Sequence, residues 1–224
     1  YNAMISACEE SRQWANGLNL LHDMLRSGVG LNTVTYNAAI SACEKAGEWT
    51  RALELFAGML VSSVEVSTLT YNALISACAR RGEWTISLAL MGGMMQNWVD
   101  VSTITYNALI TACDKGGELT KALELLRRVL SSGMTVDVIS YNAAISACEK
   151  DGEWTMALDL LSTLVRNSVE MSTITCNSLI SACVKGGAWA KTLELLDSMV
   201  QGRIDADVIT YSAAISACEK GGGW

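Results

Sequence analysis

Residues 33–67 read TVTYNAAISACEKAGEWTRALELFAGMLVSSVEVS, and this stretch decides the fold because near-copies of it fill the chain. Its tripeptide Tyr36-Asn37-Ala38 returns at a constant interval of 35 residues. The copies begin at Tyr1, Tyr71, Tyr106 and Tyr141, with altered forms at Cys176 and Tyr211. Self-similarity at a fixed period of this size is typical of solenoids. Function is therefore sought in columns, meaning the residues at equivalent positions of successive repeats.

Apolar side chains within residues 33–67 follow the spacing of two amphipathic helices. The first stripe consists of Tyr36, Ala39, Ile40 and Cys43. Gly47 then marks a helix end, and the second stripe consists of Trp49, Ala52, Leu53, Phe56 and Leu60. Each repeat is therefore predicted to be a helical hairpin. The sequence predicts an all-α fold, a right-handed α-solenoid of tandem helix-turn-helix repeats.

The composition narrows the class of protein. Half of the 224 residues are apolar, which is enough to bury a core along a stack of hairpins. No run of eighteen apolar residues occurs, so no membrane span is expected. The net charge of −7 argues against a generic nucleic-acid binder, which should be basic. Because the chain starts and stops inside a repeat, we interpret it as a fragment, and a targeting peptide or a fused catalytic domain would lie outside it.

The cysteines and the single histidine give no sign of an enzyme or of a metal site. Seven of the eight cysteines occupy one column on the first apolar stripe, and there is no CxxC pair. Neighbouring helices lie about 8–10 Å apart, too far for disulfides, so these cysteines are predicted to be small buried hydrophobic residues. His22 has no second histidine with which to build a nucleophile–base pair or a zinc site. We expect no catalytic residues, no metal and no cofactor.

The first helix of each repeat carries a polar stripe opposite its apolar one. Asn37, Ser41 and Lys45 fall on that side. The amide column consists of Asn2, Asn37, Asn72, Asn107, Asn142 and Asn177, and ends in Ser212. The basic column consists of Lys45, Arg80, Lys115, Lys150, Lys185 and Lys220. Repeated capping asparagines shared by descent would explain the amide column. The alternative is a surface on which amides contact bases and basic side chains follow a phosphate backbone.

The segments VTYNAAISACEKAGEWTRALELF and VISYNAAISACEKDGEWTMALDLL resemble the helix-turn-helix signature of the pentatricopeptide repeat (PPR) family. The resemblance covers the whole chain as one solenoid, although the family's usual proline near the repeat end is missing and Cys176 replaces a tyrosine. The complete repeats would be 33–67, 68–102, 103–137, 138–172 and 173–207, with partial repeats 1–32 and 208–224. The uniform period is similar to that of the family's pure tandem (P-class) arrays.

The resemblance implies binding of single-stranded RNA, one base per repeat, chosen by the fifth and last residues of that repeat. The pairs would be Asn2 with Asn32, Asn37 with Ser67, Asn72 with Ser102, Asn107 with Asp137, Asn142 with Ser172, and Asn177 with Asp207, while Ser212 lacks a partner. The family's rule assigns these pairs to C-C-C-U-C-U. The second residues would flank the bases: Val34, Leu69, Ile104, Ile139, Ile174 and Ile209. Since Ser, Asp and Asn are also favoured N-caps, the last-residue column has a structural explanation as well.

An alternative function is a protein-binding helical-repeat scaffold of the tetratricopeptide type. That family has a 34-residue period and its own proline pattern, and this chain has neither. The net negative charge of the chain nevertheless suits a protein ligand. Binding of protein partners in addition to RNA therefore remains an alternative, and no obligate oligomer is implied. The PPR resemblance further implies a role in organellar RNA processing, stabilisation or translation, in a chloroplast or mitochondrion.

Overall fold

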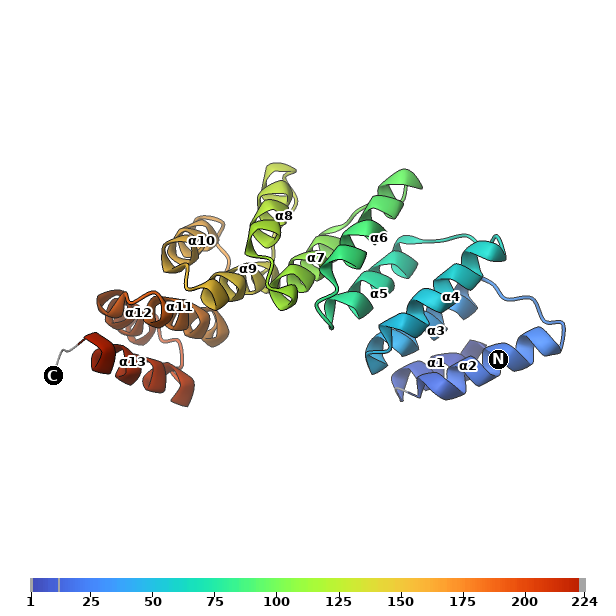
Figure 1. Ribbon diagram of the computed structural model, residues 1–224, viewed down its shortest axis with the longest axis horizontal. Coiled ribbons are helices and arrows are strands. Elements are labelled where there is room, and N and C mark those ends of the chain that lie inside the picture. Colours follow the sequence, from blue (N-terminus) through green and yellow to red (C-terminus); the bar gives the residue numbers. More distant parts are fainter. Residues whose placement is uncertain (1, 12, 222–224) are drawn as a thin grey trace. The chain divides into compact units, whose positions relative to one another are not determined.

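The computed structural model describes residues 2–11 and 13–221, and within them the side chains of Asn2 and Lys220 are not described. These residues form thirteen α-helices, and no strand is found in the described part of the chain (Figure 1). The helices are α1 (Asn2–Glu10), α2 (Trp14–Arg26), α3 (Thr33–Ala46), α4 (Trp49–Val61), α5 (Thr68–Ala79), α6 (Trp84–Gln96), α7 (Thr103–Gly116), α8 (Leu119–Ser131), α9 (Val138–Asp151), α10 (Trp154–Arg166), α11 (Thr173–Lys185), α12 (Trp189–Gln201) and α13 (Val208–Gly221). The prediction of an all-α fold made of helical hairpins is confirmed.

The chain divides into two compact halves, Tyr1–Ala112 and Cys113–Trp224. In the N-terminal half the first helices α1, α3 and α5 pack side by side. Each second helix contacts the first helix of its own hairpin, and α2 and α4 also contact the first helix of the next hairpin. The C-terminal half repeats this arrangement with α9, α11 and α13 as the stacked first helices. The first helices of each half therefore form a continuous layer.

The core of each half is built from the predicted apolar columns. Tyr36, Ile40 and Cys43 of α3 are buried, and the equivalent residues of α5 and α9 are buried in the same way. The buried tyrosine hydroxyls find partners 26 residues further along the chain, for example the Nδ2 of Asn167 donating to Tyr141 at 2.7 Å. The tyrosine column thus serves inter-helix packing, as its position on the apolar stripe predicts.

Glycine ends the first helix where the sequence predicts a turn. Gly47 and Gly152 are the C-caps of α3 and α9, with φ of 80° and 71°. A residue with a Cβ is disfavoured in this left-handed conformation, so glycine allows the chain to reverse into the second helix. Among the described residues, no helix combines the length and apolar character needed to cross a bilayer.

Candidate nucleic-acid interface

The amide column lies on the first helices of the hairpins. Five of its asparagines are half-buried there, on α3, α5, α7, α9 and α11: Asn37, Asn72, Asn107, Asn142 and Asn177. Ser212 is exposed on α13, and the side chain of Asn2 lies outside the described residues. Half-burial fixes part of each amide while leaving part of it accessible to a ligand.

The last-residue column caps the next first helix. The Oδ1 of Asn32 accepts from the backbone N of Thr35 at 3.0 Å, and the Oδ1 of Asp207 accepts from that of Thr210 at 2.9 Å. Ser67 and Ser172 form complete capping boxes with the threonines that follow them. Asp137 and Ser102 accept the equivalent backbone hydrogen bonds. The structural explanation for this column is therefore correct, and any role in recognition comes in addition to it.

The structure brings two of the predicted base-contacting pairs within direct contact. The Nδ2 of Asn177 donates to both carboxylate oxygens of Asp207 at 3.1 Å. The Nδ2 of Asn37 lies 3.4 Å from the Oγ of Ser67. Hydrogen bonds, first from the backbone N–H of Thr210 and then from its hydroxyl and from Asn177, hold the pKa of Asp207 below its ordinary value. Its carboxylate is therefore ionised and acts only as an acceptor.

The second residue of each repeat forms an exposed aliphatic column. Its members keep between 58% and 66% of their surface exposed: Val34, Leu69, Ile104, Ile139, Ile174 and Ile209. Neighbouring positions of the same helices, such as Tyr36 and Ile40, are buried. A large aliphatic residue so exposed contributes little to the core. The column is therefore available to contact a ligand beside the amides.

The basic column is engaged in ion pairs with carboxylates of the preceding repeat. Lys45 contacts Glu9 at 2.8 Å, and Lys185 contacts Glu149 at 3.2 Å. Arg80 and Lys150 contact Glu44 and Asp114 at 3.3 Å and 2.9 Å. Lys115 is exposed, and the side chain of Lys220 is not described. Four members of the basic column are thus each paired with a carboxylate of the preceding repeat.

Residues from three of the predicted columns, the basic, the aliphatic and the amide column, line a groove between α11 and α13. Lys185, Ile209 and Ser212 line it, together with Ser181, Val184 and Ala213. Its volume is about 480 Å³. Across one groove the structure therefore combines a basic side chain, an aliphatic side chain and a residue at the amide position.

A column of buried hydroxyls beside the amides was missed in the sequence. The third residue of each repeat is a threonine or serine that is almost fully buried: Thr35, Thr70, Thr105, Ser140, Thr175 and Thr210. Thr70 donates to the Oδ1 of Asn37 at 2.7 Å, although 33 residues separate them. The recurrence of threonine or serine at the third position of every repeat was the sequence signal that could have revealed this column.

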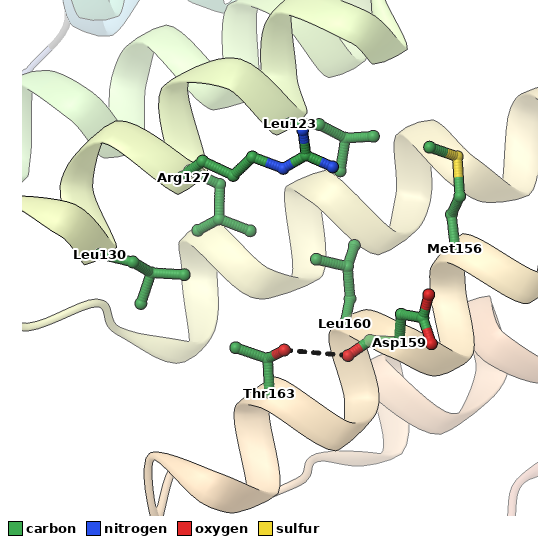
Figure 2. A pocket seen from close by; sticks show the side chains of 8 residues that line it. Leu123, Arg127, Leu130, Met156, Asp159, Leu160 and Thr163 are labelled. Atoms are coloured by element: carbon green, nitrogen blue, oxygen red, sulfur yellow. Dashed lines mark hydrogen bonds between the residues drawn. The ribbon is translucent and has the colours of Figure 1, made fainter.

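A second cavity lies on the other helices of the hairpins. Residues of α8 and α10, among them Leu123, Leu126, Met156 and Leu160, enclose about 190 Å³. Figure 2 shows Arg127 and Asp159 at its edge and the hydroxyl of Thr163 directed at the carbonyl of Asp159, which accepts from it at 3.0 Å. The cavity is mostly apolar and contains no pair of groups suited to nucleophilic or acid–base catalysis.

The side chains that could support redox or metal chemistry are buried or scattered. Burial raises the pKa of five thiols of the cysteine column to about 11: Cys43, Cys78, Cys113, Cys148 and Cys183. Such thiols stay protonated and unreactive at neutral pH. The part of the chain that the structure describes contains no cluster of three or more His, Cys, Asp or Glu side chains suited to a metal ion.

Sequence profiles of pentatricopeptide repeats match the chain along most of its length. The profile described as PPR repeat family matches residues 1–43, 31–80, 136–185 and 171–220. Profiles described as pentatricopeptide repeat domain and PPR repeat match residues 90–151 and 69–99. No curated protein matches the chain.

Solved structures of PPR proteins share its fold. The maize protein PPR10 is similar over 96% of this chain and 31% of its own, with a TM-score of 0.70 and 24% identity. Arabidopsis thaliana nuclear proteinaceous RNase P 2 (PRORP2) is similar over 85% of this chain and 43% of its own, with a TM-score of 0.75 and 13% identity. The PPR domain of A. thaliana protein-only RNase P 1 (PRORP1), solved with tRNA, is similar over 80% of this chain and 95% of its own, with a TM-score of 0.71 and 15% identity. This chain thus spans less than half of PPR10 and PRORP2. The repeat profiles and the α-solenoid fold together show that the chain belongs to the pentatricopeptide repeat family.

Proposed function

We propose that this chain binds single-stranded RNA along the layer of its first helices, with one base contacted by each repeat. The exposed aliphatic column carries the proposal, because it runs beside the half-buried amides at one residue per repeat. Bases that are pulled out of a stack need apolar contact on their faces and hydrogen bonds on their edges. PPR10 has been solved with an 18-nt psaJ RNA element and the PRORP1 PPR domain with tRNA. Family membership favours this function over a tetratricopeptide-like protein scaffold.

The donors and acceptors of two pairs support the bases that the family's rule assigns to them. Asp207 is an acceptor, so beside Asn177 it suits the N3–H donor of uracil. Ser67 can also donate, so beside Asn37 it suits the N3 acceptor of cytosine. The family's pairing rule, applied to every repeat from Asn2 with Asn32 to Asn177 with Asp207, gives the pyrimidine-rich target C-C-C-U-C-U.

Phosphates would compete with carboxylates for the basic column. Lys45, Lys150 and Lys185 each have an acidic partner, and all three remain partly exposed. Exposed ion pairs of this kind are weak, so a phosphate can displace or share the carboxylate. This competition predicts binding of moderate strength, with a salt dependence shallower than unpaired lysines would give.

The same reasoning extends to the cellular role. We propose that the chain acts in RNA processing, stabilisation or translation in a chloroplast or mitochondrion, as the family resemblance implies. Imaging of the full-length protein with a fluorescent tag, alongside organelle markers, tests this proposal. A signal confined to the cytosol or nucleus would overturn the organellar location without affecting RNA binding.

A binding series tests the RNA proposal. Gel-shift titrations at low salt compare an RNA containing CCCUCU with a control in which each pyrimidine is replaced by a purine. We expect tighter binding to the pyrimidine target. Equal binding to both would overturn the base assignments, and binding to neither would overturn the RNA proposal itself.

A matched pair of variants tests the role of the aliphatic column. Ile139→Ser changes a side chain of that column that is 58% exposed, and Val165→Ser changes one on the second helix α10 that is 59% exposed. Because both residues are similarly exposed, both variants should keep nearly the wild-type melting temperature. Only Ile139→Ser should weaken RNA binding. Equal affinities of the two variants would place the RNA elsewhere on the molecule.

A further inference from the structure

Four members of the buried hydroxyl column connect an amide to the next repeat. Thr70 and Thr105 donate to the Oδ1 of Asn37 and Asn72 at 2.7 Å. Thr175 and Thr210 donate to the Oδ1 of Asn142 and Asn177 at 2.6 Å. These four bonds join residues 33 positions apart and occur in both halves of the chain. Because the same hydrogen bond recurs four times, it is a regular part of the packing between successive repeats.

The carboxylate of Asp207 fixes which end of the amide faces the hydroxyl. Asp207 can only accept, so the Nδ2 of Asn177 must face it, and the Oδ1 must then face Thr210. The hydroxyl of Thr210 has one proton, and its bond to Asn177 is shorter than the 3.0 Å contact with Asp207. Its oxygen accepts from the backbone N of Asp207 at 3.1 Å. The amide oxygen is thus occupied, and the Nδ2 proton that does not point at Asp207 is the group left for another partner.

The repeats that end in serine place the amide in the same way. The hydroxyl of Thr70 accepts from the backbone N of Ser67 at 3.2 Å and gives its proton to Asn37. Ser67 in turn accepts from the backbone N of Thr70 at 3.3 Å and lies within reach of the Nδ2 of Asn37. Since Thr70 is fully buried, water does not compete for its hydroxyl.

We propose that the buried hydroxyl of each repeat is a positioning residue for base recognition by the repeat before it. By holding the amide oxygen, the hydroxyl directs the amide protons toward the ligand, which selects base edges that present acceptors. These include O2 and N3 of cytosine and O2 and O4 of uracil. An asparagine free to rotate would present either its donor or its acceptor end, so it would discriminate less between bases. The inference rests on the proposed RNA binding and deepens it.

One consequence is that a recognition site spans two repeats. The base contacted by Asn37 and Ser67 depends on Thr70, which belongs to the next repeat, although Thr70 contacts no base itself. Grafting a fifth and a last residue into a new array without the following hydroxyl would therefore transfer the pair but not its full selectivity.

The test compares four variants of this chain: Thr70→Val, Thr70→Ser, Thr192→Val and, for the fifth base, Thr175→Val. Thr70→Val keeps the shape of the buried side chain and removes its hydroxyl, while Thr70→Ser keeps the hydroxyl. Thr192→Val is the matched control, because Thr192 is also fully buried and its hydroxyl has no hydrogen-bond partner among the described residues. Dissociation constants are measured for CCCUCU and for the three RNAs that differ from it only at the second base, the one assigned to Asn37 and Ser67. A fifth RNA changes the fifth base, which is assigned to Asn142 and Ser172.

We expect Thr70→Val to lower discrimination at the second base by about fivefold, the value of one hydrogen bond. Discrimination at the fifth base should not change, and Thr70→Ser and Thr192→Val should behave like the wild type. Thr175→Val should reverse the pattern, affecting the fifth base and not the second. Loss of discrimination at both bases in Thr70→Val, or at neither, would overturn the positioning role.

A second measurement does not depend on RNA. In ¹H–¹⁵N spectra, Thr70→Val should shift the side-chain amide signals of Asn37, whereas Thr192→Val should leave them in place. Unshifted signals in Thr70→Val would overturn the inference. If the wild type binds no RNA while the Asn37 signals respond as expected, the proposed function fails but the hydroxyl's control of the amide stands.

Discussion

At the scale of single residues, the cysteine column shows how burial sets the chemistry of a repeated side chain. Cys43, Cys78 and Cys148 are completely buried, and this desolvation raises the pKa of each thiol from 9.0 to about 11. A raised thiol pKa means that the folded state favours the protonated form. The resulting stabilisation is complete below pH 9.0 and is lost as the pH rises toward 11.

We therefore expect the free energy of unfolding, measured by urea denaturation with a reductant present, to fall between pH 9 and pH 11. Lysines and tyrosines titrate in the same range, so a Cys78→Ala, Cys148→Ala double variant serves as control. It should lose less stability over that range than the wild type, because two of the thiols are gone. The same pH dependence in both proteins would show that these thiols are not the cause.

The pair formed by the fifth and last residues makes its own prediction. Changing Asn37 to Thr and Ser67 to Asn should move the preference at the second base from cytosine toward adenine, under the pairing rule that the family resemblance implies. Competition binding with RNAs that differ at that one base measures the change. A preference that stays with cytosine would mean that the carried-over rule does not hold here, even if RNA still binds.

At the scale of the elements, each first helix depends on the side chain that precedes it. Ser172 accepts from the backbone N of Thr175 at 3.3 Å, and the hydroxyl of Thr175 accepts from the backbone N of Ser172 at the same distance. This reciprocal pair satisfies two backbone donors at the start of α11 that would otherwise lack partners. The residue placed to contact a base is thus also the residue that starts a helix.

Ser172→Ala should lower the free energy of unfolding by about 1 kcal/mol through loss of the cap. Urea denaturation followed by circular dichroism measures the change. Ser131→Ala is a suitable control, because its exposed hydroxyl only contacts the carbonyl of Arg128 within the last turn of α8. If the two variants lose equal stability, capping is not what Ser172 contributes.

At the scale of the whole molecule, charge is arranged in pairs between repeats. The net charge of −7 conceals basic side chains that are held by carboxylates of the preceding repeat. Glu149 shows the geometry, since its Oε1 accepts from both the hydroxyl of Ser181 at 2.8 Å and the ammonium of Lys185 at 3.2 Å. Such a carboxylate positions a lysine and at the same time reduces its attraction for phosphate.

Glu149→Gln should therefore tighten RNA binding several-fold at low salt and steepen its salt dependence, because Lys185 gains charge available to phosphate. Glu194→Gln removes the same charge from an exposed ion pair with Lys191 on the second helix α12, which makes it the matched control. Filter-binding titrations over a range of salt concentrations compare the two. An equal effect of both variants would mean that only the net charge matters.

Much of the fold could be predicted because the signals for the helices and the turn lie within a single repeat. The apolar spacing from Tyr36 to Cys43, the glycine at 47 and the cap at Ser67 act within a few residues of the chain. The predicted interface is less complete. The exposure of Ile139 and its equivalents agrees with the predicted aliphatic column, whereas the ion pairs of the lysines with carboxylates of the preceding repeat appear only in the structure.

The sequence by itself determined the period, the helical hairpins, the buried columns and the caps, because these depend on local spacing and propensity. Only the tertiary structure decided that the oxygen of Asn37 is held by Thr70 and that Lys185 is held by Glu149. These contacts join residues 33 and 36 positions apart. They exist because stacking places one repeat against the next, and the helical periodicity within a single repeat contains no information about that register.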